Sequence, residues 1–449
     1  MTPKKPLASS PPSIPPTNKT SSSPRKAPPP QPPLKQKMAL GFRSLVDGAR
    51  KALTPLSTTP ASEPQQEAAS ARDLFPATDP TVDGDACLHD CDSCHINFPR
   101  GFKIDEADLL YGHIKGWSTH VLVATGKTDW VRDVEDEKGS VMQAIGGSSK
   151  KPANGRLMLS ASNMLIPNSH AHSDAERYAE PTTVLLLPAF RLVENVTPAA
   201  VPTLVERFIG IAPTNASPLG PVTLPERIPL SLSSGDQSSE NKNGLPSASD
   251  LLSRPCPHSA LILLCSQKTR DARCGQSAPL LRKELERHLR SLGLFRDLDD
   301  ERPGGVGIYF ISHVGGHKYS ANMMVYRRPD AFGVDGVARA QHEKESGGGD
   351  LKPVPRKKKE APAVVEVQQV VATEDAPETT TTTTTTEEDK KKKTEDDDDV
   401  GAGQCIWLAR VKPEDCENII KYTVLQGKVV KPDTQLRGGF DRSKGIMSW

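Results

Sequence analysis

Hydrophobic positions along the chain gather into two stretches that predict packed secondary structure. In the first stretch, short apolar runs predict three strands, and apolar positions at helical spacing predict two helices. The strands are expected over Ser118–Thr125, Leu157–Met164 and Thr182–Leu187, and the helices over Val134–Ile145 and after Thr197. The order along this part of the chain is therefore strand, helix, strand, strand, helix.

The second stretch opens with ALILL at Ala260–Leu264, an uninterrupted apolar run typical of strands that are buried on both faces. A helix is expected over Ser277–Leu292, with Ser277 as its N-cap, Pro279 in its first turn, leucines at helical spacing on one side and Gly293 after its end. The remaining elements are a strand, a two-strand hairpin and a closing helix, over Val306–Ile311, Asn322–Tyr326 with Cys405–Ala409, and Pro413–Gln426. Strand, helix, strand, hairpin, helix is the order of a thioredoxin-like domain.

Outside these stretches the hydrophobic pattern gives way to low-complexity sequence, which is rich in Pro and Ser near the start and includes eight consecutive threonines later on. Such sequence cannot bury enough apolar surface to offset the entropy lost on ordering, so we expect it to be disordered. The predicted fold class is α/β, with two thioredoxin-like domains that each have a mixed sheet flanked by helices. The predicted organisation is a disordered tail at 1–84, domains at 85–213 and at 258–328 plus 404–449, a linker at 214–257 and a disordered insertion at 329–403.

Composition excludes several classes of protein. The 449 residues include 57 basic and 56 acidic side chains, so the chain is not a generally basic nucleic-acid binder. The sequence has no apolar run of about 18 residues, so no membrane span is expected. Eight cysteines are too few for a secreted disulfide scaffold of this length. No convincing pair of catalytic carboxylates supports a glycoside hydrolase, and we expect a carrier rather than a stand-alone enzyme.

The first acidic residue is Asp47, and the sequence before it is basic and rich in Ser and Pro. This composition is compatible with a mitochondrial transit segment. An ordinary disordered tail on a cytoplasmic protein is the alternative, which the many prolines favour because they prevent an early helix.

Four candidate metal ligands follow the predicted strands of the second stretch. Cys265 ends the strand that begins at Ala260, Cys274 precedes the next helix, and His313 and His317 follow the strand Val306–Ile311. The carboxyl ends of adjacent parallel strands meet at one edge of a sheet, so two thiols and two imidazoles are expected to converge there. Such a donor set suits either a tetrahedral zinc ion or a 2Fe–2S cluster in which histidines replace two thiolates. The helix dipole is expected to lower the pKa of Cys274.

A second group of cysteines lies near the predicted start of the first domain. Cys87, Cys91 and Cys94 occur in DACLHDCDSCHINFP, with His89 and His95 between or beside them. The three thiols are candidate redox thiols, with Cys91 and Cys94 as a dithiol, and the group can alternatively hold zinc. No strand is predicted before this motif, so a thioredoxin-style active site is not expected.

Two motifs carry a resemblance to a known family. The segment CSQKTRDARCG (Cys265–Gly275), followed by SHVGGHKYSANMMVY (Ser312–Tyr326), resembles the sucrase/ferredoxin-like family of thioredoxin-like ferredoxins. ATGKTDWV (Ala124–Val131), the Cys87–Cys94 group and the tail Leu436–Trp449 are most similar to the fungal branch named for altered inheritance of mitochondria. Members often have GGHKYAGN where this chain has GGHKYSAN, a change that leaves both histidines in place.

The resemblance implies a 2Fe–2S cluster bound by two cysteines and two histidines, in a mitochondrial protein of redox or thiol homeostasis. By residue number, the implied ligands are Cys265, Cys274, His313 and His317, and the supporting loop contains Gly315, Gly316 and Lys318. The implied partners are redox proteins that donate or accept electrons, and thiol proteins. Two alternatives stay open: a zinc-stabilised interaction module, and a thiol–disulfide oxidoreductase that uses Cys91 and Cys94.

Overall fold

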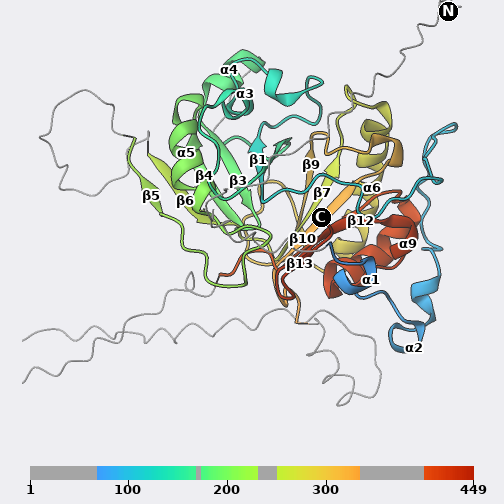
Figure 1. The fold of residues 1–449 in the computed structure, drawn as a ribbon. Coiled ribbons are helices and arrows are strands. Elements are labelled where there is room, and N and C mark those ends of the chain that lie inside the picture. The colour runs from blue at the N-terminus through green and yellow to red at the C-terminus, as the bar shows by residue number, and fades with distance from the viewer. Residues whose placement is uncertain (1–67, 168–172, 231–249, 334–398) are drawn as a thin grey trace, which may run out of the picture. The chain divides into compact units, whose positions relative to one another are not determined.

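The computed structural model describes residues 68–167, 173–230, 250–333 and 399–449, and these form one mixed sheet with helices packed against it (Figure 1). The strand order is β13-β12-β11-β10-β7-β9-β2-β1-β3-β4-β6-β5, with β8 paired to β9. The predicted α/β class, with a mixed sheet flanked by helices, is confirmed. The predictions for 1–67, 231–249 and 334–398 lie outside the described residues.

The first half of the sheet has the strand order β2-β1-β3-β4, in which β1 is parallel to β2 and antiparallel to β3. Its strands are β1 (Thr119–Ala124), β2 (Leu157–Ser162), β3 (Thr182–Leu187) and β4 (Arg191–Val196). Its helices include α3 (Val141–Gly147), α4 (Asp174–Ala179) and α5 (Val201–Arg207). The helix predicted over Val134–Ile145 is in fact a short 3-10 turn, Val134–Asp136, followed by α3, because Gly139 takes a positive φ of 75° between them.

The second half repeats this order as β9-β7-β10-β11. Here β7 is parallel to β9, and β10 is antiparallel to both β7 and β11. The strands are β7 (Ala260–Cys265), β9 (Val306–Ile311), β10 (Met323–Arg327) and β11 (Gln404–Leu408). After β7 comes α6 (Ala272–Ser291), and after β11 come η7 (Pro413–Asp415), α8 (Cys416–Asn418), η8 (Ile419–Val424) and α9 (Pro432–Gln435). Strand β12 (Leu436–Asp441) extends this half beyond β11, and the short strands β8 (Phe295–Arg296) and β13 (Ile446–Met447) pair with β9 and β12.

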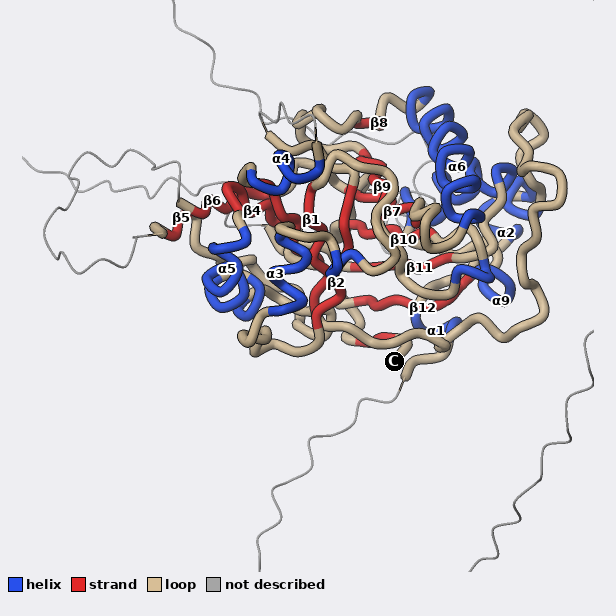
Figure 2. The backbone as a smooth tube through the Cα atoms, turned by 90° about the horizontal axis from the view of Figure 1, so that it is seen from above, coloured by secondary structure: helices blue, strands red, loops and turns tan. Residues whose placement is uncertain are grey.

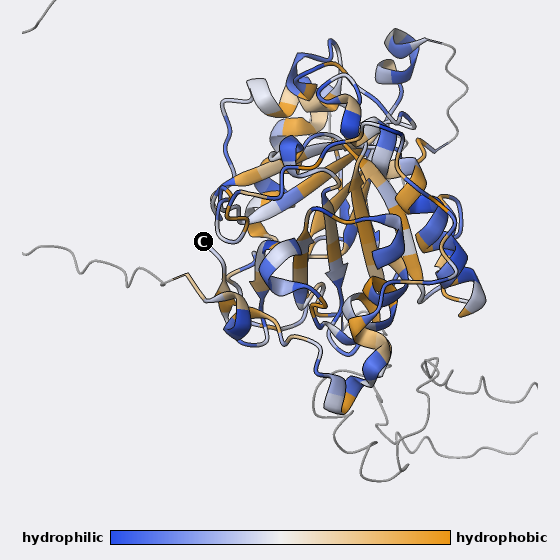
Figure 3. Cartoon of the chain, turned by 90° about the vertical axis from the view of Figure 1, so that its right-hand side faces the viewer, coloured by the Kyte–Doolittle hydropathy of each residue, from blue (hydrophilic) through white to orange (hydrophobic). Residues whose placement is uncertain are grey.

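The two halves meet where β2 pairs with β9 through Ser162 and Ile311. Successive side chains of a strand point to opposite faces, and here both faces are buried. On β7, Ile262 and Leu264 pack with α6, whereas Leu261 and Leu263 join a core that also contains Leu122 of β1. This shared core explains why the strands read as continuous apolar runs, which Figure 3 shows as hydrophobic bands along them. Figure 2 shows α3 and α5 beside the first half and α6 beside the second.

The chain before β1 packs on the second half rather than on the first. Leu74 and Phe75, at the end of α1 (Ala71–Leu74), belong to the core that α6 covers. After α2 (Pro80–Asp83), the buried carboxylate of Asp83 receives Lys428 Nζ at 2.7 Å. Part of the segment predicted as the disordered tail 1–84 therefore forms two short helices that contact the second half.

Two strands also lie within the predicted linker 214–257: β5 (Arg227–Ile228) and β6 (Leu251–Pro255), which extend the sheet from β4. The domain boundaries themselves stay a prediction. Among the described helices, none combines the length and the apolar character needed to cross a lipid bilayer.

Helix α6 begins earlier than the sequence predicts. Its N-cap is Asp271, whose carboxylate accepts the Arg273 N–H at 2.9 Å, and not Ser277. Pro279 was expected in the first turn, but it lies inside the helix, and Ser277 is buried with its hydroxyl donating to the Arg273 carbonyl at 2.9 Å. Cys274 is consequently part of the first turn of α6, which fixes the direction of its sulfur.

Candidate metal centre

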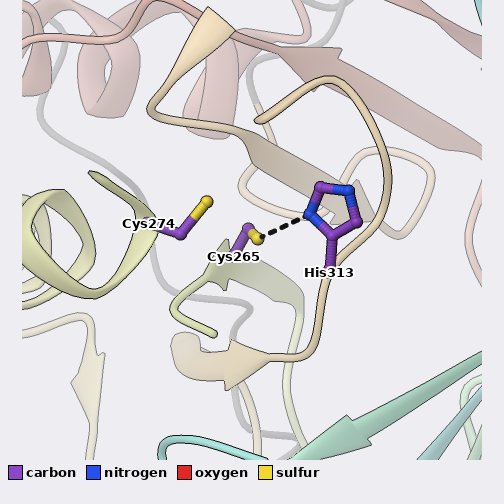
Figure 4. A group of neighbouring side chains, drawn as sticks. All are labelled: Cys265, Cys274 and His313. Carbon is purple, nitrogen blue, oxygen red and sulfur yellow. Dashed lines mark hydrogen bonds between the residues drawn. The ribbon is translucent and has the colours of Figure 1, made fainter. Parts of the chain in front are cut away.

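Three of the four predicted ligands converge at one edge of the sheet. Cys265 is the last residue of β7, Cys274 lies in the first turn of α6, and His313 follows β9. One ligand atom from each residue lies within 4.8 Å of the other two, and Cys265 Sγ is 3.9 Å from His313 Nδ1 (Figure 4). Both cysteines are buried and His313 is half-buried. Two thiols and an imidazole at these separations can hold a metal.

The fourth predicted ligand lies beside this group. Among the described residues, His317 is outside the set whose ligand atoms lie within 4.8 Å, but its ring centroid is 5.3 Å from that of His313. His317 is exposed and begins η5 (His317–Tyr319). Gly315 and Gly316 take φ values of 90° and 64°, a region that favours glycine, and they reverse the chain between the two imidazoles.

The two thiols share one negative charge in this geometry. The pKa of Cys265 is lowered to about 5, chiefly because Cys274 donates a hydrogen bond to its thiolate and His313 adds a second. The pKa of Cys274 is raised, because its S–H is held by Cys265 and because it is buried. The expectation that Cys274 deprotonates more readily is therefore wrong here: the neighbouring thiolate outweighs the helix dipole.

Lys318 anchors the histidine loop from outside. Its ammonium contacts the carboxylate of Asp108 and lies 3.6 Å from that of Asp105, and the Tyr319 hydroxyl donates to Asp108 at 2.9 Å. The Lys318 hydrogen bond is the main cause of the lowered pKa of Asp108. These contacts tie the loop to the segment before β1.

Gln267, which the sequence analysis did not single out, connects the loop between the cysteines to the first half. Its buried side chain donates to the Val131 carbonyl at 2.5 Å and accepts the His313 backbone N–H at 2.8 Å. The Ser266 hydroxyl donates to the Thr128 carbonyl at 2.8 Å. The segment ATGKTDWV therefore packs against the segment between the two cysteines, which explains why two motifs so far apart in sequence belong to one site.

Arg437 of β12 places a buried positive charge under the same loop. Its guanidinium donates to the Gly315 carbonyl at 3.1 Å and to Asn322 Oδ1 at 2.8 Å, and lies 4.4 Å from the Trp407 ring centroid. Burial lowers its pKa to about 10, and its Nε has no hydrogen-bond partner among the described residues. The charge acts on Cys265 from nearby. A sequence signal existed, because Arg437 lies in the tail motif LRGGFD.

A cavity of about 790 Å³ opens beside the histidine loop and is bounded by residues of both halves. His313 and Gly315 are among the residues that line it. Six basic side chains and one carboxylate, that of Glu135, line it: Lys115, Lys150, Lys151, Arg156, Arg270 and Arg437. This approach to the centre is therefore strongly electropositive.

The structure separates the three N-terminal candidate thiols. Cys87 is buried in η1 (Asp85–Leu88), whereas Cys91 and Cys94 are half-buried in a turn against α6. His89 and His95 are exposed. All eight cysteines lie in the described ranges, and each is a free thiol.

The chain is similar to several known proteins. "Actin patches distal protein 1" of Saccharomyces cerevisiae is 29% identical over 262 residues, 56% of this chain and 75% of that protein. "Altered inheritance of mitochondria protein 32" of Clavispora lusitaniae is 41% identical over 71 residues, or 16% and 22% of the two chains. The protein of that name from Debaryomyces hansenii is 39% identical over 66 residues, or 15% and 20%.

No solved structure matches the chain. The family model "Sucrase/ferredoxin-like" matches residues 110–438, which include β1, the cysteine and histidine motifs and Arg437. By this match over most of its length, the chain belongs to the sucrase/ferredoxin-like family.

Proposed function

We propose that the protein is an iron–sulfur electron carrier, in which Cys265, Cys274, His313 and His317 hold a 2Fe–2S cluster. The observation that carries the proposal is the convergence of two buried thiols and one imidazole. A second imidazole, that of His317, has its ring centroid 5.3 Å from that of His313. Thiolates and histidines together are the donor set of 2Fe–2S centres that have raised reduction potentials. When bound, such a cluster accepts and returns one electron at a time.

The buried positive charge of Arg437 is suited to a nearby centre that gains negative charge when it is reduced. Its guanidinium is in contact with carbonyl and amide oxygens, and no salt bridge joins it to a carboxylate among the described residues. An unneutralised buried cation is costly unless negative charge comes close to it. Arg437 therefore stabilises the form of the centre that carries more negative charge.

The outer side of the metal centre is accessible to partner proteins. His317 is exposed, and the basic cavity reaches His313. Electrostatic attraction raises the rate at which oppositely charged surfaces meet. We therefore infer that the electron donor or acceptor is a redox protein with an acidic surface beside its own cofactor. The relatives named for inheritance of mitochondria support a mitochondrial location, with the cytoplasm as the alternative.

A zinc-stabilised interaction module is the second candidate function, and one distance favours it. Cys265 Sγ and His313 Nδ1 are 3.9 Å apart, a separation typical of two ligands that share a single tetrahedral ion. Zinc has no redox chemistry, so this protein would be colourless and stabilised by the metal.

Anaerobic purification of the full chain separates the two candidates. A cluster gives visible absorption that bleaches on reduction, with iron and sulfide in equal amounts, whereas zinc gives neither. Replacing His313 by Cys is expected to retain the cluster and lower its reduction potential, because a thiolate adds negative charge. The matched control is His113→Ala, an exposed histidine that lines the same cavity. A colourless protein with stoichiometric zinc at Cys265 and Cys274 would overturn the electron-transfer proposal.

A further inference from the structure

A short turn brings two cysteines to the side of helix α6. Two residues separate Cys91 from Cys94, and the Cys94 N–H donates to the Cys91 carbonyl at 3.2 Å. The turn is tied to the second half by the Cys91 N–H, which donates to the Glu414 carbonyl at 3.0 Å, and by Lys431, which lies 2.7 Å from the Asp90 carboxylate. Cysteines at this spacing in a turn are the common half of a structural zinc site.

Helix α6 supplies two further donor groups at this place. Glu284 and His288 are one helical turn apart, and His288 Nε2 is 3.2 Å from Glu284 Oε1. Cys91 Sγ lies 3.9 Å from His288 Nε2, and one ligand atom each of Cys91, Glu284 and His288 lies within 4.8 Å of the others. The Cys94 thiol donates to the Ile96 carbonyl at 3.7 Å and lies outside this set of three, but the Glu284 carboxylate and Cys91 both act on it electrostatically. A thiol, a carboxylate and an imidazole therefore face one another, with a second thiol nearby.

The carboxylate is the least expected member of this group. The Glu284 side chain is only 2% exposed, although glutamate is almost never fully buried unless it is paired. Arg287 and His288 are its partners, and Arg287 Nη2 also contacts Cys91 Sγ at 3.5 Å. An ion pair with Arg287 accounts for the burial of Glu284, but it does not account for the Cys91 thiol and the His288 imidazole that meet at the same carboxylate, with Cys94 three residues along the same turn.

We infer that Cys91, Cys94, Glu284 and His288 form a structural zinc site, separate from the centre at Cys265. A zinc ion with two thiolates, one carboxylate and one neutral imidazole keeps one excess negative charge, which the Arg287 guanidinium neutralises from the rim. The Arg287 side chain is 44% exposed, so it can turn outward from the space that the ion takes. The partners of the N-terminal cysteines are thus residues of α6, and not the exposed His89 and His95 that lie next to them in the sequence.

The site would hold the segment before β1 against the helix that carries Cys274. His288 follows Cys274 by about four helical turns, roughly 20 Å along the axis, so the two sites do not share ligands. A structural zinc ion contributes directly to folding free energy. Zinc here would therefore stabilise the packing of the N-terminal segment, independently of whether the first centre holds iron.

Metal analysis of the full chain tests this inference. Zinc and iron are measured together after dialysis against zinc-free buffer, in the unaltered protein and in the Cys91→Ser, Cys94→Ser double variant. We expect about one zinc per chain in the first and less than a tenth of that in the second, with iron unchanged. Cys87→Ser, which alters a buried thiol of the same segment, is the matched control and should keep its zinc.

A second measurement needs no variant. Thiol-reactive reagent is added to the unaltered protein before and after a strong chelator, and the chelator should expose two additional thiols, identified as Cys91 and Cys94 by mass spectrometry. Three outcomes would overturn the inference: no zinc after incubation with zinc chloride, zinc that persists in the double variant but is lost in His313→Ala, or a Cys91–Cys94 disulfide in protein that binds no zinc. Absence of iron with zinc retained would reject the electron-transfer proposal alone.

Discussion

The imidazole of His120 in β1 lies 3.0 Å from the hydroxyl of Tyr326 in β10, inside the core that the two halves share. The other ring nitrogen of His120 is 2.9 Å from the Ser160 hydroxyl, and His120 and Tyr326 are fully buried. Two hydrogen bonds thus satisfy a neutral imidazole, and within the described ranges no carboxylate is among its partners. Burial lowers the pKa of His120 to about 3.

This pair predicts that acid loosens the contact between the halves. His120 has an ordinary pKa of 6.5 when unfolded and about 3 when folded, so below pH 6.5 the unfolded chain binds a proton that the folded chain does not. The contribution of neutral His120 to the free energy of unfolding is fully present above pH 6.5. It falls by about 1.4 kcal/mol per pH unit as the pH is lowered towards 3. Urea unfolding between pH 7.5 and 4.5 measures this slope.

His120→Gln is the matched variant for that experiment. This variant should reduce the slope of the free energy of unfolding against pH between pH 6.5 and 4.5. The slope that remains would come from His258, because burial lowers the pKa of that residue to about 4. An unchanged slope in the variant would show that other groups cause the acid sensitivity.

Arg437→Gln should lower the reduction potential of the proposed cluster. Loss of one charge several ångströms away changes the free energy of the reduced state by about 2 kcal/mol at an effective dielectric constant of 20, on the order of 100 mV for one electron. Spectroelectrochemical titration measures the shift. Arg442→Gln, which removes a buried charge from the turn that follows the same strand, is the control. Equal shifts in both variants would mean that Arg437 has no special relation to the centre.

Gln267→Ala should loosen His313 and destabilise the chain. The substitution leaves the His313 N–H and the Val131 carbonyl without the partner that now lies between them. Each unsatisfied buried group costs about 1–3 kcal/mol, so we expect about 2–4 kcal/mol less free energy of unfolding. Chemical denaturation is the measurement, and the exposed Gln143→Ala should cost far less. Similar losses for both would contradict the bridging role.

Gly439→Ala should be among the most damaging small substitutions in the second half. A Cβ at Gly439 would lie 1.9 Å from the Cys405 carbonyl oxygen, at a φ of 143°. Strand β12 would have to move away from β11, at an expected cost of about 3–5 kcal/mol. Gly293→Ala is the comparison, because it has a φ of 70° but nothing within 4 Å of the added atom. Thermal melts of both variants distinguish a steric clash from backbone strain alone.

The pattern of apolar runs was enough to predict most strands of both halves, including Val306–Ile311 at its observed limits. Local rules were less reliable at helix ends: Pro279 suggested a start near Ser277, although the Asp271 cap begins the helix earlier. Strands β4 and β12 were missed, because charged or glycine residues interrupt their apolar pattern.

The sequence by itself predicted the central strands of both halves, and it singled out Cys265, Cys274 and His313, because strand ends and adjacent motifs are local features. Only the tertiary structure brought Gln267 to Val131, Arg437 under the histidine loop, and Cys91 against His288. Those contacts join residues 122 to 197 positions apart, and no local periodicity encodes them. They arise from the packing of two similar halves of one sheet around a shared core, which depends on the summed burial of many side chains and not on any single motif.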